Sequence, residues 1–162
     1  MLTASHNPGG EDEDLGIKFN SSNGGPANES VTNRIYEESK KIKTYASAIL
    51  AADIDLDVVA EHNLGRLEGN DFDFRVSIVD SCEDYIELMK SLFDFEQMKA
   101  FVSRADFSMC FDGMHGVSGP YATKIFRDIL GVKEENLFRC NVLPDFGKGH
   151  PDPNLTYAAD LV

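Results

Sequence analysis

Tryptophan is absent from the 162-residue sequence, and cysteine, basic residues and long apolar runs are scarce. The three cysteines, Cys82, Cys110 and Cys140, are widely spaced and form no Cys-x-x-Cys pair. An odd number of cysteines at such spacing argues against a disulfide framework and against a zinc site, so reduced thiols are expected. No apolar run is long enough to cross a bilayer, and residues 1–20 lack the basic and apolar segments of a signal peptide.

Basic residues are outnumbered, because 15 lysines and arginines stand against 28 aspartates and glutamates, for a formal net charge of −13. Nucleic acids and anionic membranes are both bound through basic surface, so we expect neither as a partner. A small phosphate ester is not excluded, since a few local donors are enough to hold one phosphate. Apolar residues make up 42% of the chain, which is enough for a folded core.

The first half of the chain predicts short strands and one helix around glycine-rich loops. Asn28 suits an N-cap, and apolar residues then recur on one helical face, which predicts a helix over 29–46. Residues 52–74 are acidic and show no clear period, whereas 75–79 alternate like a strand. The other expected elements are a strand ending at residue 4, a loop over 5–15, a strand over 17–19 and a loop at 24–26.

After residue 80 the sequence changes to capped helices and a strand–helix–strand unit. The expected elements are a helix from Ser81 to Phe93, a short helix capped by Asp94, a strand over 107–111, a turn over 112–116, a helix over 119–130 capped by Ser118 and ended by Gly131, a strand over 137–142 and the start of a helix at 155. A strand–helix–strand order implies parallel pairing. The predicted fold class is α/β, with mixed or parallel sheets covered by helices. We expect two domains, residues 1–79 and 80–162.

A serine–histidine pair, Ser5 and His6, stands in a loop with Pro8, Gly9 and Gly10. A serine hydroxyl is a weak nucleophile until a base or a charge partner assists it, and histidine titrates near neutral pH. The proline and the glycines supply the turn that adjacent side chains need in order to cooperate. Lys18 is the nearest cation downstream. On composition alone, an ordinary loop and a solvated lysine are the more common interpretation.

Three ordered blocks change that balance. They are residues 2–10 (Leu-Thr-Ala-Ser-His-Asn-Pro-Gly-Gly) continued by 16–20 and 23–27, residues 112–121 (Asp-Gly-Met-His-Gly-Val-Ser-Gly-Pro-Tyr), and residues 150–161 (His-Pro-Asp-Pro-Asn-Leu-Thr-Tyr-Ala-Ala-Asp-Leu). Together they resemble the α-D-phosphohexomutase family, in its phosphoglucomutase branch. The first block resembles part of that family's domain I, and the other two resemble domain II.

The resemblance implies a role for each matching residue. Ser5 would carry a phosphoryl group and exchange it with glucose 1-phosphate or glucose 6-phosphate, through glucose 1,6-bisphosphate. His6 and Lys18 would serve acid–base chemistry and charge stabilisation. The phosphate on Ser5 would supply one ligand to Mg²⁺. The resemblance thus implies a cytoplasmic, magnesium-dependent isomerase of hexose phosphates, in which a serine, a cation and a metal neutralise the transferring group.

Several parts of the family pattern are absent from these 162 residues. They are the Asp-Gly-Asp-Gly-Asp-Arg metal loop, the sugar-specificity loop, the C-terminal phosphate-binding domain and the beginning of domain I. We therefore expect a truncated internal piece that is inactive alone and works with the remaining domains of a full-length enzyme. The acidic run at 11–14 also departs from the family and is expected to face solvent. The alternative function is a non-catalytic, phosphorylatable scaffold or regulatory relative.

Other motifs have ordinary explanations. Asp53, Asp55 and Asp57 match the start of a calcium loop, but the required glycine and glutamate are missing. Glycines at 113, 116 and 119 do not match the dinucleotide pattern and predict close helix–strand packing instead. We expect a structural role for His115 and a turn-forming role for His150.

Overall fold

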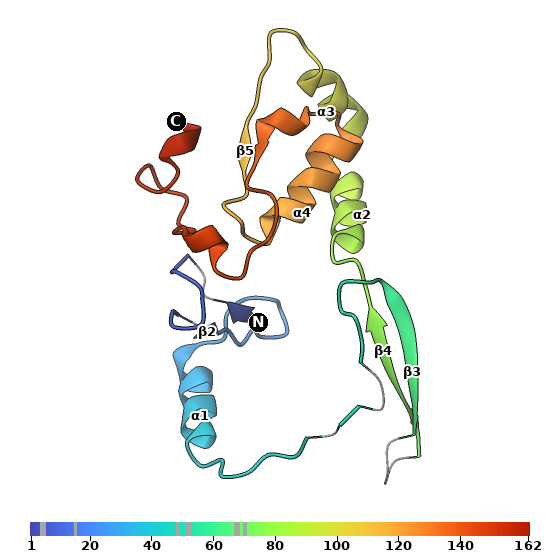
Figure 1. The fold of residues 1–162 in the computed structure, drawn as a ribbon, viewed down its shortest axis with the longest axis vertical. Coiled ribbons are helices and arrows are strands. Elements are labelled where there is room, and N and C mark those ends of the chain that lie inside the picture. The colour runs from blue at the N-terminus through green and yellow to red at the C-terminus, as the bar shows by residue number, and fades with distance from the viewer. Residues whose placement is uncertain (4–5, 15, 48, 51–52, 67–68, 70) are drawn as a thin grey trace. The chain divides into compact units, whose positions relative to one another are not determined.

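A computed structural model describes the chain except for residues 4–5, 15, 48, 51–52, 67–68 and 70. The chain forms two compact units (Figure 1). The first unit combines Met1–Ala27 with Asp84–Val162, and the second is Asn28–Glu83. These units are packing groups, so the predicted domain division at residues 79 and 80 stays a prediction. The α/β class is confirmed, because small sheets and helices occur together in the chain.

The first unit begins with a small antiparallel sheet of β1 (Leu2–Thr3) and β2 (Gly16–Ile17). Leu2 lies opposite Ile17, and Thr3 lies opposite Gly16. The predicted strand over 17–19 is shorter than expected, because the chain turns back at residues 20–26. There the amide of Ala27 donates to the carbonyl of Phe19 (2.9 Å).

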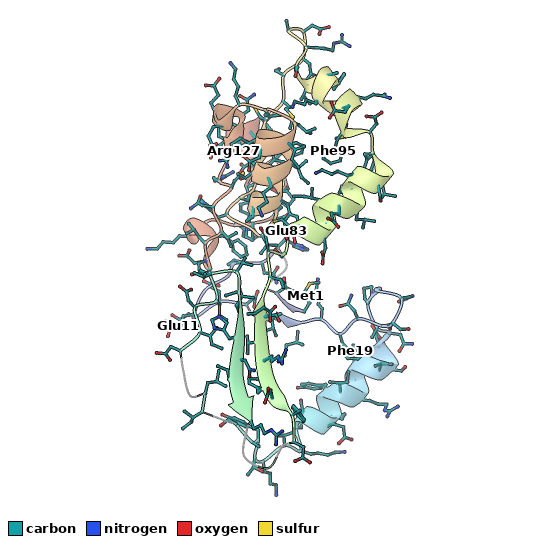
Figure 2. The ribbon with its side chains drawn as sticks, turned by 90° about the vertical axis from the view of Figure 1, so that its right-hand side faces the viewer. Met1, Glu11, Phe19, Glu83, Phe95 and Arg127 are labelled. Atoms are coloured by element: carbon teal, nitrogen blue, oxygen red, sulfur yellow. The ribbon has the colours of Figure 1, made fainter. Side chains whose placement is uncertain are left out.

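Two helices follow in this unit, α2 (Glu83–Leu92) and α3 (Phe95–Val102), whose first residues Figure 2 labels. The capping box at α3 is confirmed, since the Asp94 carboxylate accepts from the amide of Gln97 (3.0 Å) and from its side chain (2.9 Å). Helix α2 begins two residues later than predicted. The Asp80 carboxylate accepts from the amide of Cys82 (2.9 Å) and holds residues 80–82 as a turn before the helix.

The predicted parallel unit is present, but its strands are short. β5 (Phe111–Asp112) pairs with β6 (Leu137–Phe138) in parallel. Between them run α4 (Ser118–Ala122) and a π-helical stretch, Thr123–Ile129, which ends before Gly131 as expected. The prediction that Ser118 caps this helix is wrong, because Val117 occupies the cap position and Ser118 is the first helical residue.

The core of the first unit lies around this parallel pair. Met114, Ala122, Leu130 and Val132 are buried, and Leu130 is only 1% exposed. Two aromatic pairs extend the core, Tyr85 with Tyr121 (5.2 Å between ring centroids) and Phe111 with Phe126 (5.5 Å). Helix α2 is thereby packed against α4 through an edge-to-face contact.

The second unit contains α1 (Glu29–Ser39) and the antiparallel hairpin of β3 (Ala60–Arg66) and β4 (Asp73–Ile78) (Figure 1). The cap at Asn28 is confirmed, because its side chain accepts from the amide of Val31 (3.2 Å). The helix ends at Ser39 rather than at residue 46. Three lysines follow within 40–43 and Ile42 is 66% exposed, so no packing stabilises further turns.

Strand β3 lies inside the stretch that the sequence left unassigned. Its half-buried residues Ala60, His62 and Leu64 alternate with exposed ones, but histidine, asparagine and glycine weaken the apolar signal. At the C-terminus the predicted helix is wrong, since only a 3₁₀ turn forms, Ala159–Leu161. The Asn154 side chain accepts from the amides of Thr156 (2.9 Å) and Tyr157 (3.2 Å), which forms a local turn instead. Within the described part of the chain, no helix is long and apolar enough to cross a membrane.

Candidate functional site

The segment between β1 and β2 is a loop whose described residues, 6–14, close on themselves. The amide of Asp14 donates to the carbonyl of Pro8 (3.3 Å), and that of Glu13 donates to the carbonyl of Gly10 (3.3 Å). The side chains of the acidic run at 11–14 are exposed, as predicted. Gly9 packs so closely that a β-carbon there would lie 2.7 Å from Cε2 of Phe146. The loop therefore packs closely against the segment around Phe146 at Gly9.

Of the three residues that the resemblance selects for catalysis, the structure describes two. Ser5 lies outside the described residues. His6 follows β1 and is exposed, and Lys18 follows β2 and is exposed. The amide of Lys18 donates to the carbonyl of Met1 (2.8 Å), so the ladder sets Lys18 level with the start of β1, whereas His6 lies beyond its end. The catalytic roles of Ser5, His6 and Lys18 stay predictions.

A cavity of about 450 Å³ adjoins the end of β1. Its lining comes from Leu2 and Thr3, from the turn and helix start within 112–118, from 142–146, and from Pro151 and Pro153. All three sequence blocks that carry the resemblance contribute to this one cavity. Thr3, the last residue of β1, is part of this lining.

A second hollow, of about 330 Å³, lies under the loop itself. It is lined by residues 8–13 and by Asp145, Lys148 and Gly149. Lys148 is the cation among these lining residues, and its backbone is left-handed, with φ of 62°. The acidic loop and the segment 145–149 thus meet across a polar gap.

The turn after β5 is organised by one carboxylate. The side chain of Asp112 is only 4% exposed. It accepts from the amide of Met114 (2.9 Å) and from Nε of Arg139 (2.9 and 3.1 Å), and Nη2 of Arg139 donates to its Oδ2 as well. The Arg139 guanidinium holds the pKa of Asp112 below its usual range, and Asp112 in turn raises the pKa of Arg139.

The backbone around this pair is strained. Met114, His115 and Arg139 have φ of 48°, 58° and 46°, and each such non-glycine residue costs about 1–2 kcal/mol. Hydrogen bonds hold the two segments in place. The amide of His115 donates to the carbonyl of Arg139 (2.9 Å), its Nδ1 donates to the carbonyl of Asn141 (2.9 Å), and its carbonyl accepts from the amide of Leu143 (3.1 Å). His115 makes the structural contact that the sequence predicts.

Two glycines of the second block confirm the predicted close packing. A β-carbon on Gly113 would lie 2.8 Å from the carbonyl oxygen of Arg139, and one on Gly119 would lie 2.0 Å from that of Cys140. Sequence reasoning did not single out Asp112 or Arg139. An acidic residue at the carboxyl end of a parallel strand, directly before a glycine turn, was the available signal for Asp112. The sequence does not indicate Arg139 as the partner of Asp112, because this contact depends on the left-handed backbone at residue 139.

The described residues contain no group of three or more histidine, cysteine or acidic side chains arranged to hold a metal. The predicted magnesium ligand is the phosphate on Ser5, outside that set, so this prediction stays open to experiment. The three cysteines are unpaired: Cys82 is buried, Cys110 exposed and Cys140 half-buried. Burial raises the pKa of the Cys140 thiol.

Comparison with known proteins agrees with this geometry. Residues 1–46 match the family model described as phosphoglucomutase/phosphomannomutase, alpha/beta/alpha domain I. The chain is 51% identical to the cytoplasmic phosphoglucomutases of Populus tremula and Pisum sativum over all 162 residues, which is 27% of each relative's length. A crystal structure of the exocytosis-sensitive phosphoprotein pp63/parafusin, a phosphoglucomutase from Paramecium, in its open form, superposes with a TM-score of 0.89. That match is 49% identical and covers 99% of this chain and 29% of that one.

The chain thus spans about a quarter of the length of the relatives it matches, and it matches them from its first block to its last. Both the sequence identity and the superposition extend over the loop, the cavity and the parallel strand pair described above. Over its whole length the chain is thus similar to part of the phosphoglucomutases, and its residues 1–46 match the domain I model of the phosphoglucomutase/phosphomannomutase family.

Proposed function

We propose that the protein acts as a phosphoglucomutase, interconverting glucose 1-phosphate and glucose 6-phosphate. The observation that carries this proposal is the cavity of about 450 Å³ at which the end of β1, the turn after β5 and the segment of Pro151 and Pro153 meet. A pocket of this size accepts a small ligand such as a sugar phosphate. The relatives are named phosphoglucomutases, and these names support the same reaction.

The chemistry balances around one serine. The phosphoryl group on Ser5 is transferred to the free hydroxyl of the bound hexose phosphate, the bond to the Ser5 oxygen breaks, and glucose 1,6-bisphosphate forms. The other phosphoryl group of that bisphosphate then returns to Ser5. His6 moves the proton of the attacking or leaving oxygen, and Lys18 stabilises negative charge. The phosphate on Ser5 would supply one ligand to Mg²⁺, which would provide charge neutralisation at the transferring group.

Location and partners follow from the same assignment. The relatives from Populus tremula and Pisum sativum are named as cytoplasmic, and we propose the same location for this protein. The substrate is a hexose phosphate, and neither nucleic acid nor membrane is a partner. Because these residues correspond to 27% of the relatives' length, turnover needs the portions that supply the metal loop and the sugar-specificity loop, and the 162 residues alone are inactive.

The test is phosphoryl labelling of the protein at its natural length. Incubation with radiolabelled glucose 1,6-bisphosphate is expected to leave acid-stable label on Ser5. Ser5→Ala is expected to lose both the label and the conversion of glucose 1-phosphate. Ser21→Ala is the matched control, a serine of the next exposed loop, and is expected to retain both. Label on another residue, or normal turnover by Ser5→Ala, would contradict the proposal.

A second candidate function is a phosphorylatable scaffold without turnover. The observation that favours it is that the Paramecium relative is named both as a phosphoprotein and as a phosphoglucomutase. The same labelling experiment separates the two functions. A phosphate on Ser5 that persists when unlabelled glucose 1-phosphate and Mg²⁺ are added indicates a scaffold, whereas rapid loss of label into the sugar indicates the enzyme.

A further inference from the structure

The most tightly organised cluster outside the Ser5 loop is the ion pair of Asp112 and Arg139. We propose that Asp112 and Arg139 are positioning residues that hold together the two walls of the 450 Å³ cavity. Neither residue has a role implied by the family resemblance. The proposal deepens the proposed function and rests on it in one respect, namely that this cavity receives the sugar phosphate.

The two walls come from different parts of the chain. One wall is the turn and helix start within 112–118, and the other is the segment 142–146, which continues from Arg139. The connection between them is made just behind the cavity, where residues 139–143 bond to the turn through the three hydrogen bonds of His115. Whatever fixes residues 139–141 therefore fixes the second wall.

Arg139 bonds the turn twice. Its carbonyl accepts from the amide of His115 (2.9 Å), and its guanidinium donates to Asp112 through Nε and Nη2. Both contacts require the left-handed backbone at this residue, where φ is 46°. Strained conformations of this kind persist only when the surroundings determine them. The guanidinium of Arg139 holds this backbone conformation, because its two donors on the buried carboxylate of Asp112 fix both the distance and the direction of the side chain.

The burial of Asp112 makes the pair costly to break. With its side chain 4% exposed, the carboxylate without Arg139 would retain only the amide of Met114 as a hydrogen-bond donor. A buried charge left without its partner rearranges its surroundings or draws in water. Asp160 also approaches Arg139, with 3.8 Å between its Oδ2 and Nη1, but its side chain is 89% exposed. Asp112 is thus the partner that matters, and Asp160 offers a matched control.

Cys140 reports on the same contact. It follows Arg139 directly, its thiol donates to the carbonyl of Phe138 (3.3 Å), and its carbonyl lies against Gly119. The thiol is half-buried, whereas Cys110, two residues before Asp112, is exposed. Alkylation of Cys140 relative to Cys110 therefore measures how often residues 139–141 leave the turn, with Cys110 as the internal reference.

The experiment compares four variants of the protein at its natural length: Arg139→Gln, Asp112→Asn, Arg139→Lys and Asp160→Asn. Alkylation with iodoacetamide is followed by mass spectrometry. Because local opening exposes the thiol, Arg139→Gln and Asp112→Asn are expected to raise the Cys140 to Cys110 ratio by about tenfold. Arg139→Lys keeps the charge without the fork and is expected to raise it by about threefold. Asp160→Asn is expected to leave it unchanged. If Asp112→Asn fails to fold, the alkylation ratios of the two Arg139 variants still test the proposal.

The kinetic arm separates positioning from mere stability. A displaced wall weakens binding of the sugar phosphate, so Arg139→Gln is expected to raise the KM for glucose 1-phosphate by about tenfold, with a smaller change in kcat. A lower folded fraction with an unchanged KM, or an unchanged alkylation ratio in folded Arg139→Gln, would overturn the proposal. If the parent protein has no mutase activity but the alkylation pattern holds, the positioning pair stands and the proposed function fails.

Discussion

Two loops of the first unit are built in opposite ways. The turn at 112–116 is tied to residues 139–143 by a buried ion pair, by three hydrogen bonds of His115 and by glycines that leave no room for a β-carbon. The loop at 6–14 closes on itself through two backbone hydrogen bonds of 3.3 Å and carries exposed acidic side chains. The first is specified by tertiary contacts, and the second mainly by its own short-range turns.

The two loops also line different cavities, because the turn at 112–116 lines the cavity of about 450 Å³ and residues 8–13 line the hollow of about 330 Å³. Of the residues that the family resemblance marks for chemistry, His6 lies in the loop at 6–14. Asp112, which lines the larger cavity, belongs to the turn at 112–116, and Arg139 holds it from the neighbouring segment. A site that both receives and releases a phosphoryl group needs a rigid frame as well as groups that reach the reacting oxygen.

Replacement of Gly119 by alanine tests the tight turn at its closest contact. The new β-carbon would lie 2.0 Å from the carbonyl oxygen of Cys140, and backbone cannot yield as a flexible side chain can. We expect the free energy of unfolding to fall by about 3 kcal/mol, measured by urea denaturation. Gly24→Ala is the control in the same unit, because φ there is 82° and nothing lies within 4 Å. It is expected to cost about 1 kcal/mol, from backbone strain alone. Equal losses for both would show that the turn is looser than its contacts indicate.

Neutralising Asp112 tests the ion pair. Breaking a buried pair costs about 3–5 kcal/mol, and the 30% exposure of Arg139 reduces this to about 2 kcal/mol for Asp112→Asn. The stabilisation by this pair depends on pH, because Arg139 lowers the pKa of Asp112 in the folded state. The stabilisation is therefore fully present above the unfolded value of about 3.9 and is lost as pH falls through the lower folded value. Urea midpoints of both proteins should differ at pH 7 and converge in acid. A difference that persists unchanged at the lowest accessible pH would show that packing, not charge, is responsible.

Alanine at Gly9 tests the close packing of the other loop, where a β-carbon would also lie 3.0 Å from the carbonyl oxygen of Pro144. Its β-carbon would lie 2.7 Å from the ring of Phe146, a side chain that can move. We expect a loss of about 1 kcal/mol in the free energy of unfolding. Phe146→Leu in the same protein should restore most of it, because the smaller side chain leaves room. A double-mutant cycle by urea denaturation measures this coupling, and additive effects would show that loop and ring do not touch in solution.

The sequence predicted the elements that depend on local chemistry. The caps at Asn28 and Asp94, the end of the helix before Gly131 and the parallel strand pair follow from residue type and spacing. The errors arise where tertiary contacts decide. β3 was missed because its inward positions include His62, and the helix expected after Leu155 gives way to a turn bonded to Asn154. Of the site, the loop and its acidic exposure were predictable, whereas the Asp112–Arg139 pair was not, because it depends on a left-handed backbone at residue 139.

Neutralising the acidic run is expected to have the smallest effect of all. Glu11→Gln, Asp12→Asn, Glu13→Gln and Asp14→Asn remove four exposed negative charges from the loop that follows Ser5. Exposed charges contribute little to folding, so the urea midpoint should stay within error of the parent. Repulsion between this run and an incoming sugar phosphate is screened over about 8–10 Å, so any change should appear as a modest fall in KM that disappears as ionic strength rises. A large loss of stability would instead show that the loop depends on these charges as the turn at 112–116 depends on Asp112, and the contrast between the two loops would fail.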